Sequence, residues 1–371
     1  MPNIVINAVG DISFGDHPIC VGFGVQSSFR KKANKDLPAT TKNLLTKADI
    51  VFGNLECVLS SDGIKNRNLG NLQMRGDKEF VNILVESRFT ILNVANNHMM
   101  QHGEDHFSKT INLLKENNIK VCGLASDKFT LIRKNDIKIG FLGYSMRPRQ
   151  YFTKQPLYCE GTEETILNDI KIYKKLTDCL ITSLHWGEEF IEKPSPEEIR
   201  IARNMIDSGA DLIIGHHPHV LRGIESYKNG LIAYSMGNFI CDMTWEEKTR
   251  ECIILTCIIN KCGIEDYEFT PLYVNNDYLP APCNPLLHKK LISKINRLSY
   301  ELKHDNLENY DIKLKHYFSD AHRCLQIHRL NSYKHFIKNI FRYKPIILFE
   351  IIFSALARKI QTVYVRYLRY Y

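Results

Sequence analysis

The chain has 371 residues, more than the roughly 100 to 200 residues of one ordinary domain, so the sequence predicts a large domain with an appendage. Hydrophobic residues make up 44% and charged residues 24%, which excludes a disordered or fibrous protein. The net charge of +8 belongs to the tail, because residues 285–371 contain 17 basic against 6 acidic side chains, whereas residues 1–284 contain 32 against 35.

Short apolar runs alternate with helical patterns over residues 1–284, as is typical of an α/β fold. Strands are expected at 4–9, 50–52, 89–94, 129–133, 137–144, 179–184, 211–214, 231–235 and 252–259, the last of them beside a sheet edge. Helices are expected at 40–48, 78–88, 104–117, 163–176 and 196–208. Asn135-Asp136 predicts a hairpin, and residues 273–285 predict a linker. The pattern after it is helical, so we expect a domain at 1–284 and a basic helical extension at 285–371.

Polar side chains suited to metal binding follow five of the expected strands. In chain order they are Asp11, Asn54, Glu56, Asn97, His98, His185, His216, His217 and His219. A lone Asp after a strand is more often a turn or cap residue, and a lone His is more often a hydrogen-bonded residue near a core. Their coincidence at five strand ends favours one shared site, because ligands bind beyond the carboxyl ends of strands in open α/β sheets.

The mixture of side chains predicts the chemistry of this site. Carboxylate and amide oxygens together with imidazole nitrogens suit divalent ions such as Mn, Fe(II) or Zn, and there is no Cys cluster for a structural thiolate site. Two such ions, roughly 3.5 to 4 Å apart and bridged by a carboxylate, activate water near neutral pH. The sequence has no Gly-x-Ser-x-Gly motif for a nucleophilic serine. We therefore expect hydrolysis with one or two divalent ions and no covalent enzyme intermediate.

Several segments also resemble a known family, the CapA family of capsule and poly-γ-glutamate synthesis proteins, in their order and spacing. These segments are Gly10-Asp11-Ile12, Asn54-Leu55-Glu56, Ala95-Asn96-Asn97-His98, His185-Trp186-Gly187-Glu188, Gly215-His216-His217-Pro218-His219-Val220 and Tyr234-Ser235-Met236-Gly237-Asn238-Phe239. The resemblance covers about residues 3–245. It implies a metallophosphatase-like four-layer α/β/β/α sandwich that serves the synthesis of an anionic surface polymer.

The resemblance also implies a role for each candidate ligand. Asp11 and His219 would hold one metal ion, and Glu56 would bridge both ions. Asn97, His185 and His217 would hold the second ion. These roles are those of the matching family positions, and composition or spacing alone does not establish them.

Three positions around the implied site bear on its activity. His98 matches the catalytic histidine that contacts the substrate or protonates the leaving group, a task suited to an imidazole that titrates near neutral pH. Ser13 stands where the wider metallophosphatases have a histidine, as CapA-like sequences also lack it, so the first ion is one ligand short unless His17 or Asp16 compensates. Gln101 stands where the family usually has Asp.

Three functions follow as hypotheses. The leading one is a metal-dependent hydrolase in capsule or poly-γ-glutamate production, acting on a phosphate ester or on an amide bond of an anionic polymer. The vacancy at Ser13 motivates the second, a metal-binding assembly or export component of the synthesis machinery without turnover. Nucleic-acid binding by the basic tail is disfavoured, because the tail interleaves aliphatic residues with its charges and contains no recognisable nucleic-acid module.

The cysteines and the two ends of the chain suggest where the protein acts. The odd number of 11 cysteines and the lack of a Cys-x-x-Cys pair argue against a disulfide framework, and the first residues have no signal-peptide pattern, so we expect a cytoplasmic protein.

Residues 334–371 are expected to dock on the inner membrane face, or equally to pack on the protein or a second subunit. The apolar runs 346–349 and 351–353 are split by Glu350 and are too short to span a bilayer. Side chains suited to the interface surround them, namely Arg342, Lys344, Arg358, Lys359, Arg366, Arg369, Tyr364, Tyr367, Tyr370 and Tyr371.

Overall fold

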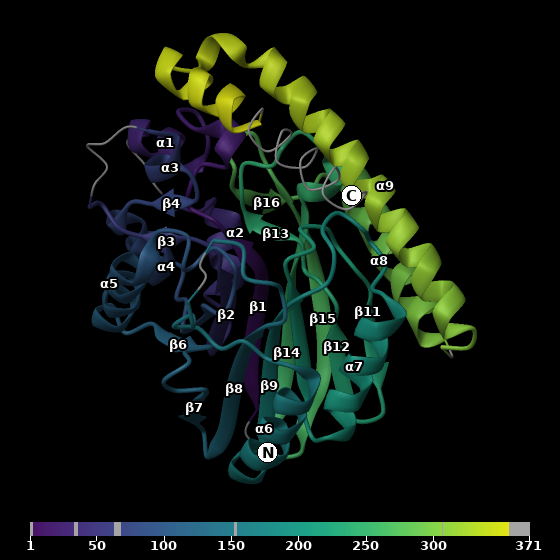
Figure 1. Cartoon of the computed structure of the whole chain (residues 1–371). Helices are drawn as coiled ribbons and strands as arrows, with labels where there is room; N and C mark the ends of the chain where they lie inside the picture. Colours follow the sequence, from purple (N-terminus) through teal and green to yellow (C-terminus); the bar gives the residue numbers. More distant parts are fainter. Residues whose placement is uncertain (1–2, 33–35, 63–67, 152–153, 306, 356–371) are drawn as a thin grey trace.

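A computed structural model describes residues 3–32, 36–62, 68–151, 154–305 and 307–355 of the chain (Figure 1). One large sheet contains β1 (Ile4–Ile12), β2 (Ile50–Leu55), β5 (Ile91–Asn93), β6 (Lys120–Cys122), β13 (Asn238–Ile240), β14 (Glu251–Asn260), β15 (Gly263–Val274) and β16 (Pro280–Pro282). Its strand order is β16-β15-β14-β1-β2-β5-β6, and β13 pairs with β1. The two short strands β3 (Val58–Leu59) and β4 (Arg75–Gly76) pair separately.

The second large sheet has the order β11-β12-β10-β9-β8-β7. Its strands are β7 (Phe129–Lys134), β8 (Ile137–Ser145), β9 (Cys179–His185), β10 (Leu212–His216), β11 (Ile224–Tyr227) and β12 (Gly230–Ala233). The helices are α1 (Val25–Lys31), α2 (Ala39–Leu45), α3 (Leu69–Leu72), α4 (Val81–Glu86), α5 (Gly103–Glu116), α6 (Glu163–Tyr173), α7 (Pro196–Asp207), α8 (Pro285–Lys303) and α9 (Tyr310–Lys338).

Alternate residues of the central strands face two different apolar layers. In β1, Ile6 and Ala8 face the layer between the two sheets, whereas Val9 faces the layer that α2, α4 and α5 cover. In β9, Ile181 faces the layer between the sheets and Leu180 packs toward α6 and α7. Strands buried on both faces read as continuous apolar runs, which is why the sequence revealed them. The expected four-layer α/β/β/α sandwich is therefore confirmed.

Local signals fix several of the elements where they were expected. The hairpin between β7 and β8 turns at Asn135 and Asp136, whose φ angles of 48° and 60° are those of a two-residue hairpin loop. Helix α7 begins at a capping box, in which the Ser195 side chain and the Glu198 side chain each bond the other residue's backbone N–H. These contacts hold the segment that follows β9.

The structure corrects three expectations in the last part of the sandwich. β14 lies between β1 and β15 rather than beside a sheet edge. The expected linker at 273–285 contains the end of β15 and all of β16, which pair with one another. β15 was not expected, because most of its residues are partly or fully exposed and it carries charged residues such as Glu265 and Glu268, so its apolar alternation is weak.

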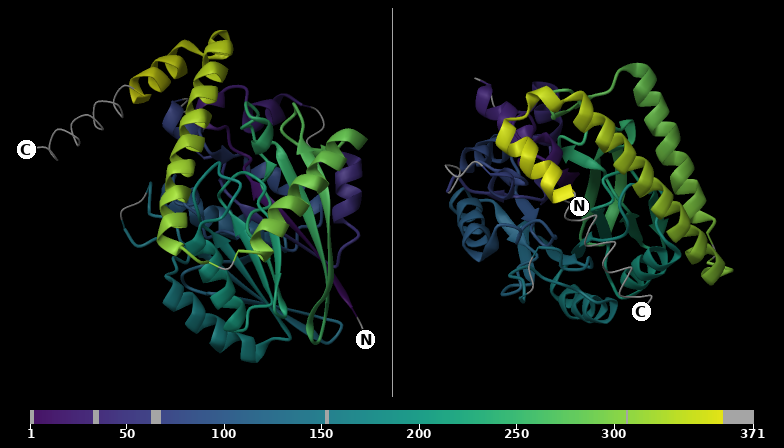
Figure 2. Two further views of the ribbon diagram at one scale, coloured as in Figure 1. Left: turned by 90° about the vertical axis from the view of Figure 1, so that its right-hand side faces the viewer. Right: turned by 45° about the horizontal axis from the view of Figure 1, so that its top comes forward.

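The C-terminal helices lie against the sandwich. Leu291 and Ile295 of α8 are fully buried in the layer between the sheets. Helix α9 then runs along the outside of the molecule toward a last helical segment, residues 345–355, shown in yellow in Figure 2. In the described ranges, no helix combines the length and apolar character needed to cross a membrane. A division of the chain at residue 284 stays a prediction.

Candidate metal centre

The candidate ligands gather where parallel strands of both large sheets end. Asp11 in β1 lies beside Asn54 in β2, and His216 at the end of β10 lies beside His185 at the end of β9. Both β1 and β9 extend further than expected, so Asp11 and His185 belong to their strands instead of following them. One sheet supplies Asp11, Glu56 and Asn97, and the other supplies His185, His217 and His219.

The structure brings all of these predicted ligands into one cluster, with Glu56 in the middle. His185 Nε2 lies 2.8 Å from Asn97 Oδ1 and 3.4 Å from Glu56 Oε1. On the other side, His219 Nδ1 lies 3.4 Å from Asp11 Oδ2 and 3.9 Å from Glu56 Oε2. Glu56, His217 and His219 offer ligand atoms that all lie within 4.8 Å of one another. The two oxygens of Glu56 therefore face two different groups of donors.

Several buried polar atoms of this cluster have no hydrogen-bond partner. They are Glu56 Oε1, His185 Nδ1, His216 Nε2 and both ring nitrogens of His217, whereas His216 Nδ1 lies 3.2 Å from Asp11 Oδ1. A buried polar group left without a partner costs about 1–3 kcal/mol, so such a concentration of them needs an explanation. Oxygen and imidazole donors pointing into one buried space suit a divalent ion of the Mn, Fe(II) or Zn type. The residues present thus fit a metal.

The charges in the cluster perturb one another strongly. Burial raises the pKa of Glu56 well above its usual range, and the nearby charge of Asp11 raises it further. Burial also acts to raise the pKa of Asp11, but His216 and His219 outweigh it and hold that pKa well below its usual range. For His219, burial lowers the pKa, yet Glu56 and Asp11 overcome this and raise it to about 10. Protonated His219 therefore lies beside the ionised carboxylate of Asp11, and the two charges offset one another.

The loop that carries His217 and His219 has an unusual backbone. Their φ angles are 94° and 57°, in a region that non-glycine residues rarely adopt, at a cost of about 1–3 kcal/mol each. Two contacts hold this conformation. The backbone N–H of His217 donates to Asp11 Oδ2 at 3.1 Å, and His219 Nδ1 bonds Asn238 Oδ1 at 2.9 Å. Such strain is typical of functional sites.

Two asparagines position the cluster, and the sequence had suggested no such role for them. Asn54 is fully buried and donates to Asp11 Oδ1 at 2.8 Å, while its own oxygen accepts from Asn93 at 3.0 Å and Asn96 at 3.2 Å. Asn238 lies beside Asp11 because β13 pairs with β1. The signal that could have identified them is their place inside the matched segments, directly beside candidate ligands.

His98 lies at the edge of the cluster, with 15% of its side chain exposed and Nε2 4.0 Å from Glu56 Oε1. Its Nδ1 bonds Gln101 Oε1 at 2.8 Å, so Gln101 orients the imidazole where the family has a carboxylate. Burial lowers the pKa of His98 to about 4, and the Gln101 bond offsets this only in part. The ring of Tyr151 lies 5.3 Å from that of His98.

The residues that might replace the missing histidine ligand are engaged elsewhere. The carboxylate of Asp16 accepts hydrogen bonds from the backbone of Gly22 and Ser27, so it belongs to that loop and does not compensate. His17 Nδ1 accepts from the backbone of Ile19 and caps a short 3-10 helix. The Ser13 hydroxyl is buried and has no hydrogen-bond partner.

Helix α9 reaches the cluster from outside. The ring of His328 stacks on that of Phe190 at 3.5 Å, and Phe190 in turn stacks on His219 at 6.0 Å. His328 Nδ1 also lies 2.8 Å from Glu246 Oε1. The C-terminal extension therefore backs the loops that carry the candidate ligands.

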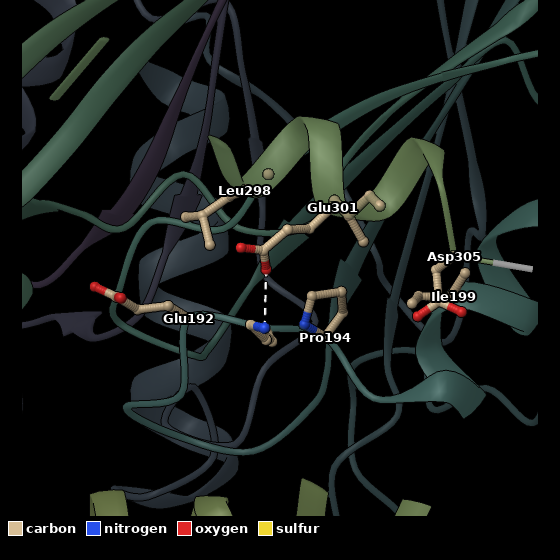
Figure 3. Close-up of a pocket in the computed structure, with 9 residues that line it drawn as sticks. Glu192, Pro194, Ile199, Leu298, Glu301 and Asp305 are labelled. Atoms are coloured by element: carbon tan, nitrogen blue, oxygen red, sulfur yellow. Dashed lines mark ion pairs between the residues drawn. The ribbon is translucent and has the colours of Figure 1, made fainter. Parts of the chain in front are cut away.

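A small pocket of about 90 Å³ lies elsewhere, between the segment after β9 and α8 (Figure 3). Glu192, Pro194, Glu301 and Asp305 are among its lining residues, and Lys193 Nζ pairs with Glu301 Oε2 at 2.9 Å. None of the residues that line it belongs to the metal cluster. We therefore assign it no part in the chemistry of that cluster.

Comparison with known proteins shows which proteins this chain is similar to. It is 29% identical over 306 residues to the capsule biosynthesis protein CapA of Bacillus anthracis, covering 78% of this chain and 72% of the relative. The PGA biosynthesis protein CapA of Bacillus subtilis is 29% identical over 300 residues, covering 78% and 77%. A 5'-nucleotidase structure from Candida albicans superposes with a TM-score of 0.40 at 13% identity, over 80% of this chain and 58% of that one. The family model of the bacterial capsule synthesis protein PGA_cap matches residues 5–243, a range that includes every candidate ligand, and the chain belongs to that family.

Proposed function

We propose that this protein is a metal-dependent hydrolase of the metallophosphatase type that acts in capsule or poly-γ-glutamate biosynthesis. The observation that carries the proposal is the buried cluster around Glu56, whose two oxygens face donors from different sheets. The relatives named for capsule and PGA biosynthesis support the process in which it acts.

The roles assigned to the ligands follow the two sides of the cluster. Asp11 and His219 would hold one ion, and Glu56 would contribute an oxygen to each side. Asn97, His185 and His217 would hold a second ion, on the side where His185 contacts Asn97. Divalent ions bound there would supply Lewis acidity and activate water near neutral pH.

His98 is the candidate catalytic residue among the side chains that are not ligands. Gln101 fixes Nδ1, which leaves Nε2 directed toward the cluster. From there it is placed to contact a bound substrate. Its pKa of about 4 differs from the near-neutral value expected from the sequence, so the ring is neutral at pH 7, and proton donation to the leaving group would require bound substrate to raise that pKa. The proposed substrate is a phosphate ester or an amide bond of an anionic polymer, because divalent ions held in the cluster would attract an anionic group.

A second candidate function is a metal-binding assembly or export component that does not turn over. Ser13 and the engagement of Asp16 favour it, because they leave the first ion with fewer protein ligands. Both candidates require metal, so metal binding alone does not separate them.

The deciding experiment measures rate and metal content together. A phosphodiester, a phosphomonoester and γ-linked glutamate oligomers are offered to the purified protein with added Mn, Zn or Fe. The hydrolase predicts turnover of one substrate class, lost in His98→Asn while metal content is kept. His316→Ala, an exposed histidine of α9, serves as the control and should keep both. Metal binding without turnover of any of the three substrates would favour the assembly function.

A further inference from the structure

The last helical segment, residues 345–355, is apolar on both sides. Its inner side packs Tyr343, Ile347 and Ile351 against a small core that includes Cys20 and Phe23. Its outer side nevertheless leaves large apolar side chains in the open. A helix that is apolar all round is normally covered on all sides, so the outer side lacks a partner in the isolated chain.

These exposed apolar residues all fall in one stretch of the chain, from the end of α9 to the end of the last helical segment, and the rings of Phe349 and Phe353 lie 6.1 Å apart. We call this set of residues the C-terminal apolar face, and it consists of Ile337 (66% exposed), Phe341 (99%), Ile346 (57%), Phe349 (68%), Ile352 (43%) and Phe353 (61%). A concentration of large exposed apolar side chains such as this usually marks a protein or membrane contact. Scattered single exposed residues would not need this explanation.

Basic side chains flank this face along the chain. Lys334, Lys338 and Lys344 are exposed beside it. Glu350 is the single acidic residue between positions 334 and 355 in the sequence, and its carboxylate accepts a hydrogen bond from the backbone of Leu69. The carboxylate of Glu350 is thus directed toward the protein. Apolar side chains flanked by lysines remain on the outside, which suits an interfacial helix on an anionic bilayer.

We infer that the C-terminal apolar face docks on the surface of an anionic lipid membrane. A second copy of this chain fits less well, because a symmetric contact would bring the lysines of both copies together. The sequence continues the same pattern, with Arg358, Lys359, Arg366 and Arg369 among apolar residues and with Tyr364, Tyr367, Tyr370 and Tyr371, although all of these lie outside the described residues. The inference does not rest on the proposed hydrolase activity.

The position of the C-terminal apolar face determines which end of the molecule docking would bring to the membrane. The segment 345–355 packs on residues around Cys20, shortly after β1, the strand that carries Asp11. Figure 1 shows this segment, in yellow, at the end of the molecule toward which β1 runs. Docking would therefore turn the end that holds the metal cluster toward the lipid surface.

Flotation of the full-length protein with vesicles tests the inference. Vesicles of phosphatidylglycerol mixed with phosphatidylcholine are compared with phosphatidylcholine alone. We expect binding to the anionic vesicles, weakened by salt, and roughly fivefold weaker for each lysine removed in Lys338→Gln and Lys344→Gln. Phe349→Glu should lower binding more than tenfold, since burying one aromatic side chain contributes about 1.5–3 kcal/mol. Leu286→Glu changes an apolar residue on α8 that is 81% exposed, more than Phe349, and should bind like the wild type.

Three results would overturn the inference. One is no binding to anionic vesicles, and another is equal binding by wild type and Phe349→Glu. The third is a wild-type dimer in light scattering that Phe349→Glu dissociates, because the face would then be a contact between copies. Thermal unfolding of each variant checks that the fold is intact, which the outward position of Phe349 leads us to expect.

Discussion

Replacing Asn54 by leucine removes a contact that holds Asp11 without removing a proposed ligand. The side chain of Asn54 is fully buried and makes three hydrogen bonds, to Asp11, Asn93 and Asn96. Asn96 retains another bond, from its amide to the carbonyl of Leu55 at 2.8 Å. The substitution thus leaves Asp11 Oδ1 and the amide of Asn93 without these partners.

The size of the effect follows from those contacts. Lost hydrogen bonds contribute about 1 kcal/mol each, and a buried group left unpaired costs about 1–3 kcal/mol, so we expect a loss of roughly 2–4 kcal/mol in the free energy of unfolding. Loss of a partner that orients a metal ligand typically weakens metal binding about 10-fold to 100-fold. Asn54→Leu should therefore lower both stability and metal affinity.

Asn7→Leu, on β1, the strand that carries Asp11, is the matched control. Asn7 is also buried and hydrogen-bonded, to the carbonyl of Leu44 and the hydroxyl of Thr256, but it contacts no ligand. Urea unfolding of metal-free protein measures stability, and calorimetric titration with Mn measures affinity. We expect similar losses of stability but weaker metal binding in Asn54→Leu alone. Equal metal affinities in the two variants would refute the positioning of Asp11 by Asn54.

Three further predictions concern residues around the cluster. Ser13→His should strengthen binding of the weaker ion by restoring a ligand, and unchanged stoichiometry and affinity in calorimetry would show that no vacancy exists. Burial and the charge of Asp16 raise the pKa of Asp242 to about 8, so the folded protein holds a proton that the unfolded chain loses near pH ~3.9. The stability of the wild type relative to Asp242→Asn should therefore fall as the pH rises from 5 to 8, and a constant difference in urea unfolding would contradict this. His328→Ala removes the ring stacked on Phe190 and should weaken Mn binding up to about tenfold; unchanged affinity would mean that α9 does not support the cluster.

The sequence predicted most of the sandwich because its central strands are buried on both sides. Strands such as β9 and β10 are buried at every residue and mostly apolar, so their positions could be read directly. The position of β15 could not be read in this way, because its partly exposed residues break the apolar alternation. β15 pairs with β16, so part of the segment expected to be a linker belongs to the sheet. Edges and irregular segments depend on tertiary pairing that local patterns do not encode.

The candidate ligands could be predicted, because the ends of strands are visible in a sequence. The residues that hold those ligands in place could not be predicted. His328 acts on His219 through Phe190, and these three residues are far apart in the chain. Gln101 looked like a departure from the family pattern, whereas its contact with His98 gives it a definite place. Contacts between side chains set such roles, and spacing alone does not show them.

The metal content of the purified protein and of two ligand variants tests the central claim most directly. Elemental analysis of the wild type should find one or two equivalents of Mn, Fe or Zn. His185→Ala and His217→Ala should lose most of this metal and any hydrolysis, with the fold retained in circular dichroism. His316→Ala should match the wild type. Full metal content and full rate in either ligand variant would contradict the assignment of this cluster as the metal centre.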